Sequence, residues 1–325
     1  MSVPYNDLME NFETAQLDVS HTQLISRREL LRLALGAGIV VCTGGVVMAT
    51  PINTKPIPRT GELLPVIGLG TWQTFDVGRS ESERAPLREV LREFARLGGK
   101  VIDSSPMYGQ SESVVGDLAG KLKLHNHLFI ATKVWTSGRD AGIRQMKESF
   151  RRLQTERMDL MQIHNLVDWR THLATLRQWK NDGRIRYVGV THYTASAYEQ
   201  LAAVLEKEEL DFVQLNYSIA EREAERRLLP LAADRRVAVL VNRPFAQAQL
   251  FSKVRGKPVP PWAKEIGCAS WAQFFLKFVV SHPSVTCAIP ATSKVQHLID
   301  NMRAGIGEFP DAKMRERMAK VVSDL

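Results

Sequence analysis

The sequence predicts an α/β chain that folds as a single (β/α)8 (TIM) barrel behind an N-terminal signal segment. Short apolar runs alternate with helical patterns in eight β-then-α units over about 260 residues, the usual length of such a barrel. The runs are short and mainly apolar, as expected for parallel strands buried on both faces. A doubly wound sheet is the alternative, but the motif GLG (Gly68 to Gly70) is followed by TWQ and lacks the third glycine of a dinucleotide fingerprint. The pattern therefore favours closure into a barrel.

The predicted strands are short apolar runs that end in polar or turn-forming residues. In chain order they span 66–72, 100–104, 128–135, 158–166, 185–193, 210–218, 237–245 and 284–293. The predicted helices carry apolar residues three and four positions apart, as Ile143, Met146, Phe150 and Leu153 do in the third helix. These helices span 82–97, 111–121, 141–153, 170–183, 195–207, 221–236 and 269–281, and the last begins near 294.

Local signals mark several helix ends. Gly98 and Gly99 follow the first helix and Gly183 closes the fourth, as glycine commonly does. Pro230 is expected to kink or interrupt helix 221–236, because proline lacks the N–H that an interior helical hydrogen bond needs. A long loop follows the seventh strand and runs to about Gly267.

Composition is that of a globular chain able to bury a sizeable core, with 325 residues, 44% hydrophobic and 24% charged. The net charge is +8, and residues 1–49 hold three arginines against five acids, so the basic excess lies in the remainder. Its dispersal favours solvated helix faces, with attraction of an anionic ligand such as a phosphorylated cofactor as the alternative. No pattern points to a nucleic-acid partner. The three cysteines and the histidines lack metal-ligand spacing, so no metal site is predicted.

The N-terminus is predicted to be a targeting signal, which divides the chain into signal (1–50), linker (51–60) and barrel (61–325). Ser26-Arg27-Arg28 precedes an uncharged run that ends in small residues. This resembles a twin-arginine export signal, which implies the twin-arginine export machinery as a partner and a periplasmic or exported location. The alternative is an uncleaved membrane anchor at residues 30–49, a run near the lower length limit and diluted by glycines.

Titratable residues follow three successive predicted strands. Asp103 ends the second strand, Tyr108 lies in the loop after it, Lys133 is near the end of the third and His164 ends the fourth. Singly each suits a turn or a strand end, but in a barrel these ends meet on the active-site face. A lysine lowers the pKa of a nearby tyrosine, an aspartate keeps the lysine charged, and a histidine can orient a carbonyl oxygen. The set predicts a general acid, and because no nucleophile is placed, we expect an external hydride donor.

The segments around these residues resemble the aldo-keto reductase family over almost all of residues 60–305. The resemblance rests on GLGTW, VIDSSPMYG, ATKVW, LMQIHN, IRYVGVTHY, QLNYS and AIPATSKVQHLIDN. It implies a nicotinamide cofactor bound without a Rossmann fold, usually NADP, with NAD as the alternative. It also implies reduction of a small-molecule carbonyl substrate, an aldehyde or ketone, to an alcohol. The catalytic residues implied are Asp103, Tyr108, Lys133 and His164, with Tyr108 as the general acid.

The resemblance also implies cofactor contacts, which carry over to Gly70, Thr71, Trp72, Asp103, Thr191, His192, Gln214, Asn242, Arg243, Pro244, Thr292, Ser293, His297 and Asn301. Several depart from the family pattern. His192 replaces an asparagine, Asn242 stands where an aromatic ring commonly stacks on the nicotinamide, and Arg243 replaces a small residue. His297 stands where many relatives have arginine, which leaves Lys294 as a substitute partner for a 2′-phosphate.

Two other functions stay open from the sequence. A cofactor-binding regulatory or interaction subunit with little catalysis would keep the fold, and the unusual nicotinamide contacts leave room for it. A barrel lyase or isomerase would leave nicotinamide unbound. The intact set of four residues favours the enzyme, and a Tyr108→Phe comparison separates it from the regulatory subunit.

Overall fold

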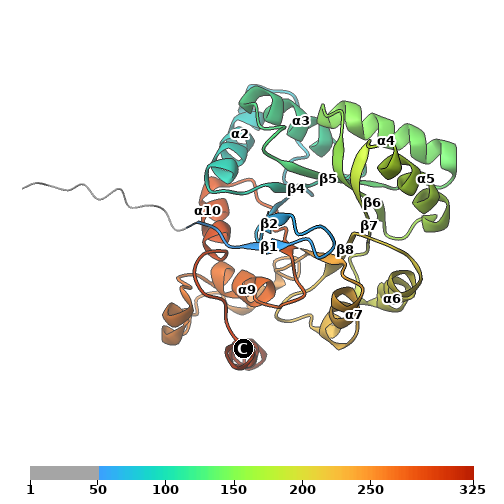
Figure 1. Cartoon of the computed structure of the whole chain (residues 1–325). Coiled ribbons are helices and arrows are strands. Elements are labelled where there is room, and N and C mark those ends of the chain that lie inside the picture. Colours follow the sequence, from blue (N-terminus) through green and yellow to red (C-terminus); the bar gives the residue numbers. More distant parts are fainter. Residues whose placement is uncertain (1–50) are drawn as a thin grey trace, which may run out of the picture. The chain divides into compact units, whose positions relative to one another are not determined.

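The computed structural model describes residues 51–325, which form a closed barrel of eight parallel strands (Figure 1). The strands are β3 (Leu69–Gly70), β4 (Val101–Asp103), β5 (Phe129–Val134), β6 (Met158–His164), β7 (Ile185–Thr191), β8 (Phe212–Asn216), β9 (Ala238–Asn242) and β10 (Cys287–Ala288). Neighbours pair in chain order, and the parallel bridges Ile67–Ala288 and Gly70–Ala291 join the first strand to the last. The predicted (β/α)8 barrel is therefore confirmed. The predicted export signal lies outside the described residues.

Helices surround the strands (Figure 1). The α-helices are α2 (Glu81–Arg96), α3 (Ser111–Leu122), α4 (Arg139–Leu153), α5 (Trp169–Asn181), α6 (Tyr198–Lys207), α7 (Leu228–Asp234), α8 (Gln249–Lys253), α9 (Trp271–Val280), α10 (Val295–Arg303) and α11 (Ala312–Ser323). Helix α2 begins with a capping box, because the Ser80 side chain accepts from the Glu83 N–H while the Glu83 carboxylate accepts from the Ser80 N–H. Its buried residues Leu87, Leu91 and Phe94 recur at helical spacing and pack into the core.

Two predicted elements differ in the structure. Helix 221–236 is divided into a 3₁₀ turn, η2 (Glu223–Arg226), and helix α7, with the break at Arg227. Pro230 therefore lies in the first turn of α7, where its missing N–H leaves no helical hydrogen bond unmade. The loop before Gly267 is also not structureless, since it contains α8 and the 3₁₀ segment η3 (Pro261–Ile266).

The segment 51–60, expected to be a linker, takes part in the fold. Strand β1 (Thr54–Pro56) pairs antiparallel with β2 (Leu63–Pro65). Ile57 and Leu64 from this hairpin are buried in the cluster that fills the barrel interior. The Lys55 ammonium donates to the carbonyl oxygens of Val280, His282 and Val285 at 2.7–2.8 Å. The hairpin is thus part of the barrel.

The barrel interior has an apolar layer below a polar one. Side chains alternate along a strand, so residues two apart face the same side. On β6 this order runs from Leu160 in the apolar cluster to Gln162 and then to His164 at the strand end. On β8 it runs from Phe212, also in that cluster, to Gln214. The pattern brings polar side chains together only where the strands end, which is where the site forms.

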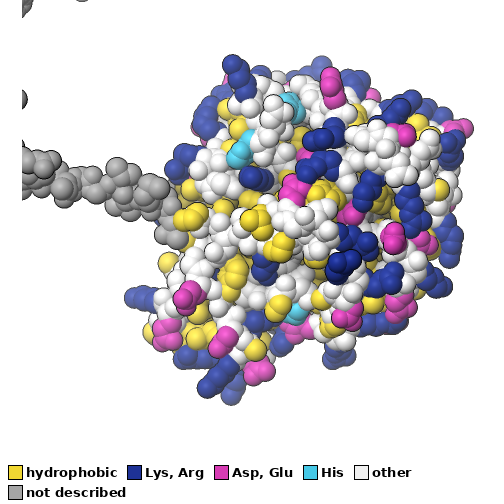
Figure 2. All heavy atoms as spheres, in the orientation of Figure 1, with side chains coloured by type: hydrophobic (Ala, Val, Ile, Leu, Met, Phe, Trp, Pro, Cys, Tyr) yellow, Lys and Arg dark blue, Asp and Glu magenta, His cyan; other side chains and the backbone are white. Residues whose placement is uncertain are grey.

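The charged side chains are mixed on the face seen in Figure 2. Lysine and arginine side chains lie among aspartate and glutamate side chains there, without forming one continuous basic patch. Within residues 51–325, no helix has both the length and the apolar character needed to cross a bilayer.

Candidate active site

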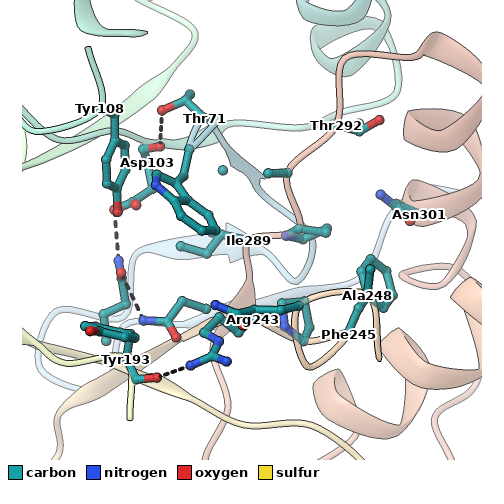
Figure 3. Close-up of a pocket in the computed structure, with 18 of the residues that line it drawn as sticks. Thr71, Asp103, Tyr108, Tyr193, Arg243, Phe245, Ala248, Ile289, Thr292 and Asn301 are labelled. Carbon is teal, nitrogen blue, oxygen red and sulfur yellow. Dashed lines mark hydrogen bonds between the residues drawn. The ribbon is translucent and has the colours of Figure 1, made fainter. Parts of the chain in front are cut away.

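A cavity of about 1030 Å³ opens at the carboxyl ends of the strands. The last residues of five strands contribute to its wall: Gly70, Asp103, His164, Thr191 and Asn242. Tyr108 and Asp103 lie at one end of the cavity, and Thr292 and Asn301 lie at the other (Figure 3). Its size, at the upper end of the range for small-molecule sites, leaves room for a cofactor and a substrate together.

Most of the residues that the sequence predicted for the site contribute to this wall. Those present are Gly70, Thr71, Trp72, Asp103, Tyr108, His164, Thr191, Gln214, Asn242, Arg243, Pro244, Thr292, His297 and Asn301. Lys133 lies behind the wall, buried beneath Asp103 and Tyr108. The other two, His192 and Ser293, do not contribute to the wall.

Asp103 and Lys133 form a buried ion pair. The Lys133 Nζ lies 2.6 Å from Asp103 Oδ2 and donates also to the Ser104 carbonyl oxygen at 2.6 Å. Asp103 Oδ1 accepts from the side-chain amides of Gln162 at 3.0 Å and Gln214 at 2.9 Å. Burial lowers the pKa of Lys133, but the Asp103 carboxylate and Tyr108 together more than offset this, so the Lys133 pKa lies above its ordinary value. The lysine is therefore a fixed positive charge at neutral pH.

Tyr108 projects from the β4–α3 loop towards this charge. The Lys133 Nζ lies 5.0 Å from the centre of the Tyr108 ring. Burial raises the pKa of Tyr108 above its ordinary value, and this outweighs the lowering by the Lys133 ammonium. The sequence argument anticipated the lowering effect but not the larger effect of burial. The phenol is consequently protonated at neutral pH, with a cation close by to stabilise the phenolate once a proton has left.

His164 faces Tyr108 edge-on, with ring centres 5.8 Å apart. Burial lowers the pKa of His164 to about 2, and the Lys133 ammonium adds to this effect, so the imidazole is neutral. Its Nδ1 lies 3.0 Å from the hydroxyl of Ser105, which is fully buried. The sequence analysis selected neither Ser105 nor Gln162 for the site. The alternation of β6 was the available signal for Gln162, which lies two residues before His164 on the same face.

A second polar network continues from Gln214 towards the β7 and β9 strand ends. Gln214 Oε1 accepts from the Thr191 hydroxyl at 3.2 Å and from the Asn242 amide at 3.3 Å. The His192 ring is turned into its own loop, where Nδ1 accepts from the Tyr193 N–H at 3.0 Å and the ring stacks on Tyr193. Tyr193, which sequence reasoning did not select, contributes to the wall instead.

Among residues 51–325, Arg243 is the one lysine or arginine in the cavity wall. Its guanidinium donates to the Tyr193 carbonyl oxygen at 2.8 Å (Figure 3). Its Nε and the neighbouring Asn242 Oδ1 are buried without a hydrogen-bond partner in the described part of the chain. Such a donor and acceptor side by side fit the polar groups of a nicotinamide nucleotide.

The far end of the cavity combines aromatic, hydroxyl and amide groups from the loops after β9 and β10 and from α9 and α10. Besides Thr292, His297 and Asn301, it includes Trp271 and Asp300. The Asp300 carboxylate accepts from the Ser270 hydroxyl at 2.7 Å and from the Gln273 amide. The backbone of Ala246, Gln247 and Ala248 is left-handed, which is unfavourable for residues with a Cβ. Strain of this kind is characteristic of segments that hold ligands.

These contacts define what the site can do chemically. Tyr108 and His164 offer hydrogen-bond donors to one region of the cavity, and a buried cation lies behind Tyr108. The arrangement can bind a carbonyl oxygen and supply a proton to it as negative charge develops. The cavity wall contains no cysteine, and within residues 51–325 no group of three histidine, cysteine or acidic side chains could hold a metal ion. A proton donor beside room for a second molecule suits the reduction of a carbonyl group by a bound hydride donor.

Comparisons with known proteins identify the family. Residues 66–321 match the model of the aldo/keto reductase family, so the chain belongs to this family of enzymes. It is 30% identical over 259 residues to methylglyoxal reductase YeaE of Escherichia coli, which covers 77% of this chain and 89% of that protein. An NADH-specific methylglyoxal reductase of E. coli is 28% identical over 239 residues, covering 64% and 72%.

The fold is also shared with solved structures. An aldo-keto reductase from Klebsiella pneumoniae in complex with NADPH superposes with a TM-score of 0.69 at 25% identity. The match covers 85% of this chain and 96% of that one. The two chains therefore share the barrel fold over most of their length.

Proposed function

We propose that this protein reduces aldehydes or ketones to alcohols with NADPH, and that Tyr108 is the general acid. The observation that carries the proposal is the pairing of a protonated Tyr108 with a neutral His164 at the cavity end where the Lys133–Asp103 ion pair is buried. Relatives named as methylglyoxal reductases support a carbonyl substrate, and the NADPH complex supports the cofactor.

In the proposed reaction the substrate carbonyl oxygen accepts hydrogen bonds from the Tyr108 hydroxyl and the His164 ring. The bound reduced nicotinamide supplies a hydride to the carbonyl carbon. As the C=O π electrons move to oxygen, the proton of the Tyr108 hydroxyl passes to that oxygen, and the alcohol forms. Lys133 stabilises the phenolate left on Tyr108, while Asp103 holds Lys133 in place. Solvent then returns a proton to Tyr108.

Tyr108→Phe tests this assignment. The substitution removes the acidic hydroxyl and keeps the ring, so kcat for aldehyde reduction should fall by roughly 10²- to 10⁴-fold. The Kd for NADPH, measured by fluorescence titration, should change little because the ring still closes that side of the cavity. A variant that oxidises NADPH with an aldehyde panel as fast as the wild type would show that the general acid is another group. Tight NADPH binding with no turnover in the wild type would instead favour the regulatory-subunit alternative.

We further propose a preference for NADPH over NADH, with different residues contacting different phosphates. Arg243, the single lysine or arginine that residues 51–325 contribute to the wall, suits the negative charge common to both cofactors. His297 in the wall and Lys294, the residue that precedes helix α10, suit the 2′-phosphate. Arg243→Met should therefore raise the Kd of NADPH and NADH alike, and Lys294→Ala should raise that of NADPH alone. Equal weakening of both cofactors by Lys294→Ala would contradict the assignment of that residue.

Export by the twin-arginine route is the remaining part of the proposal and rests on residues 26–50. Because free nicotinamide cofactors are expected to be scarce outside the cytoplasm, we propose that the exported protein retains its cofactor and recycles it by paired oxidation and reduction of two substrates. Replacement of Arg27 and Arg28 by lysine should abolish export in cell fractionation. Rapid loss of cofactor from the exported protein on dilution would refute retention.

A further inference from the structure

The Ser105–His164 contact ties two loops of the barrel together at the candidate site. Ser105 lies in the turn after β4, two residues beyond Asp103, and His164 ends β6. Ser105 Oγ and His164 Nδ1 are 3.0 Å apart, and both side chains are buried. The distance alone does not say which atom carries the proton, since a neutral imidazole can donate or accept at Nδ1.

The surroundings of Ser105 decide the direction of this bond. Its hydroxyl is fully buried, so its proton needs an acceptor within the protein. Ser105 Oγ has two polar neighbours in the described part of the chain, His164 Nδ1 and the Met107 N–H at 3.4 Å. The Met107 N–H can only donate, so Nδ1 is the sole acceptor for the Ser105 proton. Ser105 therefore donates and His164 accepts.

The direction of the bond selects the tautomer of His164. The imidazole is neutral, because burial lowers its pKa to about 2. A neutral ring that accepts at Nδ1 must carry its hydrogen on Nε2. With Nδ1 occupied by Ser105, Nε2 is the ring nitrogen left to serve the cavity. In the other tautomer an unprotonated Nε2 would present a lone pair to the lone pairs of a carbonyl oxygen.

We infer that Ser105 is a positioning residue that holds His164 in the Nε2–H tautomer, so that the cavity presents two hydrogen-bond donors, Tyr108 and His164, to one carbonyl oxygen. Its link to catalysis rests on the proposed reductase function. The turn that presents Tyr108 would then also set the hydrogen-bonding state of His164 on a distant strand. One loop would thus prepare both donors.

The test combines spectroscopy of the free protein with kinetics. Full-length chain labelled with 15N-histidine gives the protonation state of each ring nitrogen by NMR, and a His164→Gln variant assigns the His164 signals among the eight histidines. We expect wild-type Nε2 to be protonated and Nδ1 unprotonated. In Ser105→Ala this single pattern should be lost, and kcat/KM should fall on the order of 10- to 100-fold with an NADPH Kd within about twofold of wild type.

Ser218→Ala is the matched control. Ser218 is also fully buried and also accepts a backbone N–H, from Glu221 at 3.0 Å, but no histidine of residues 51–325 is hydrogen-bonded to it. It should change neither the His164 signals nor kcat/KM. The inference is overturned if wild-type His164 carries its proton on Nδ1, if Ser105→Ala keeps the Nε2–H pattern, or if the pattern changes without loss of kcat/KM. Because the NMR measurement needs no turnover, a wild-type protein that fails to reduce carbonyls would refute the proposed function without deciding the tautomer.

Discussion

The Lys133–Asp103 pair allows a quantitative prediction, because both partners are removed from water. The two side chains are 0% and 4% exposed, and their charged atoms are 2.6 Å apart. Removing one partner of a buried pair typically costs about 3–5 kcal/mol, because the other charge stays buried without compensation. In Lys133→Met, Asp103 retains the amides of Gln162 and Gln214, so we expect the lower end, about 3 kcal/mol.

The double variant Asp103→Asn/Lys133→Met carries no buried charge at this position. We therefore expect it to lose no more stability than either single variant, which corresponds to a coupling free energy of about 3 kcal/mol. Urea unfolding followed by circular dichroism measures the free energy of unfolding of all four proteins. Single-variant losses that add to within about 0.5 kcal/mol would refute the reasoning, because additivity means that the two groups do not interact.

The surface pair Glu148–Arg151 serves as the control for this cycle. Its charged atoms are also 2.6 Å apart, but the Arg151 side chain is 74% exposed. The two pairs have the same distance between charged atoms but differ in exposure, so a comparison of their coupling free energies shows the effect of burial. Solvent screening should make the coupling free energy of Glu148–Arg151 far smaller. A comparable coupling in both cycles would show that distance alone, and not burial, determines the coupling.

Three further predictions concern the pH profile, the substrate wall and the barrel closure. Burial lowers the His164 pKa to about 2 and raises that of Tyr108, so kcat/KM for reduction should be flat from about pH 6 to about pH 9. A change of kcat/KM with pH in that range that disappears in Tyr108→Phe or His164→Gln would contradict this. Trp135 is 41% exposed, and the centre of its ring lies 6.4 Å from that of His164. Trp135→Ala should therefore lower kcat/KM about tenfold or more for aromatic aldehydes and less for methylglyoxal, as measured with an aldehyde panel. Equal losses for both substrates would refute a role of Trp135 in packing against the substrate. A Cβ on Gly70 would lie 2.7 Å from the Ile289 carbonyl oxygen, so Gly70→Ala should lower the free energy of unfolding, measured in urea, by about 1–3 kcal/mol. As the control, Gly120→Ala in α3 should leave the free energy of unfolding unchanged or raise it. An unchanged free energy of unfolding in Gly70→Ala would contradict the close approach.

The barrel and the positions of four polar residues follow from sequence because they depend on regular features. Eight alternating units indicate a parallel barrel, and in a parallel sheet every strand ends on the same face. Asp103, Lys133 and His164 therefore had to approach one another once their strands were recognised. Tyr108 follows because a turn of only a few residues separates it from Asp103.

Features that depend on side-chain direction did not follow from the sequence. The His192 ring turns into its loop because Tyr193 and Thr194 offer N–H donors there, a local competition that residue type does not reveal. The first part of the hairpin 54–65 falls in the predicted linker 51–60, because strands of only three residues show no detectable periodicity. Helix α11 is absent from the expected series because the eight-unit pattern is complete before it begins.

Several polar contacts of the site form one continuous network, which relates ligand binding to proton donation. Lys133 contacts Asp103, Asp103 contacts Gln214, and Gln214 contacts both Thr191 and Asn242. Gln214 therefore uses its amide to hold the carboxylate that keeps Lys133 in place and its carbonyl oxygen to hold the groups beside Arg243. A ligand that draws Asn242 away removes one donor from Gln214 Oε1 but leaves its amide on Asp103. The cation behind Tyr108 can thus stay fixed while the part of the cavity beside Asn242 and Arg243 adjusts, because the two ends of one glutamine side chain serve the two tasks separately.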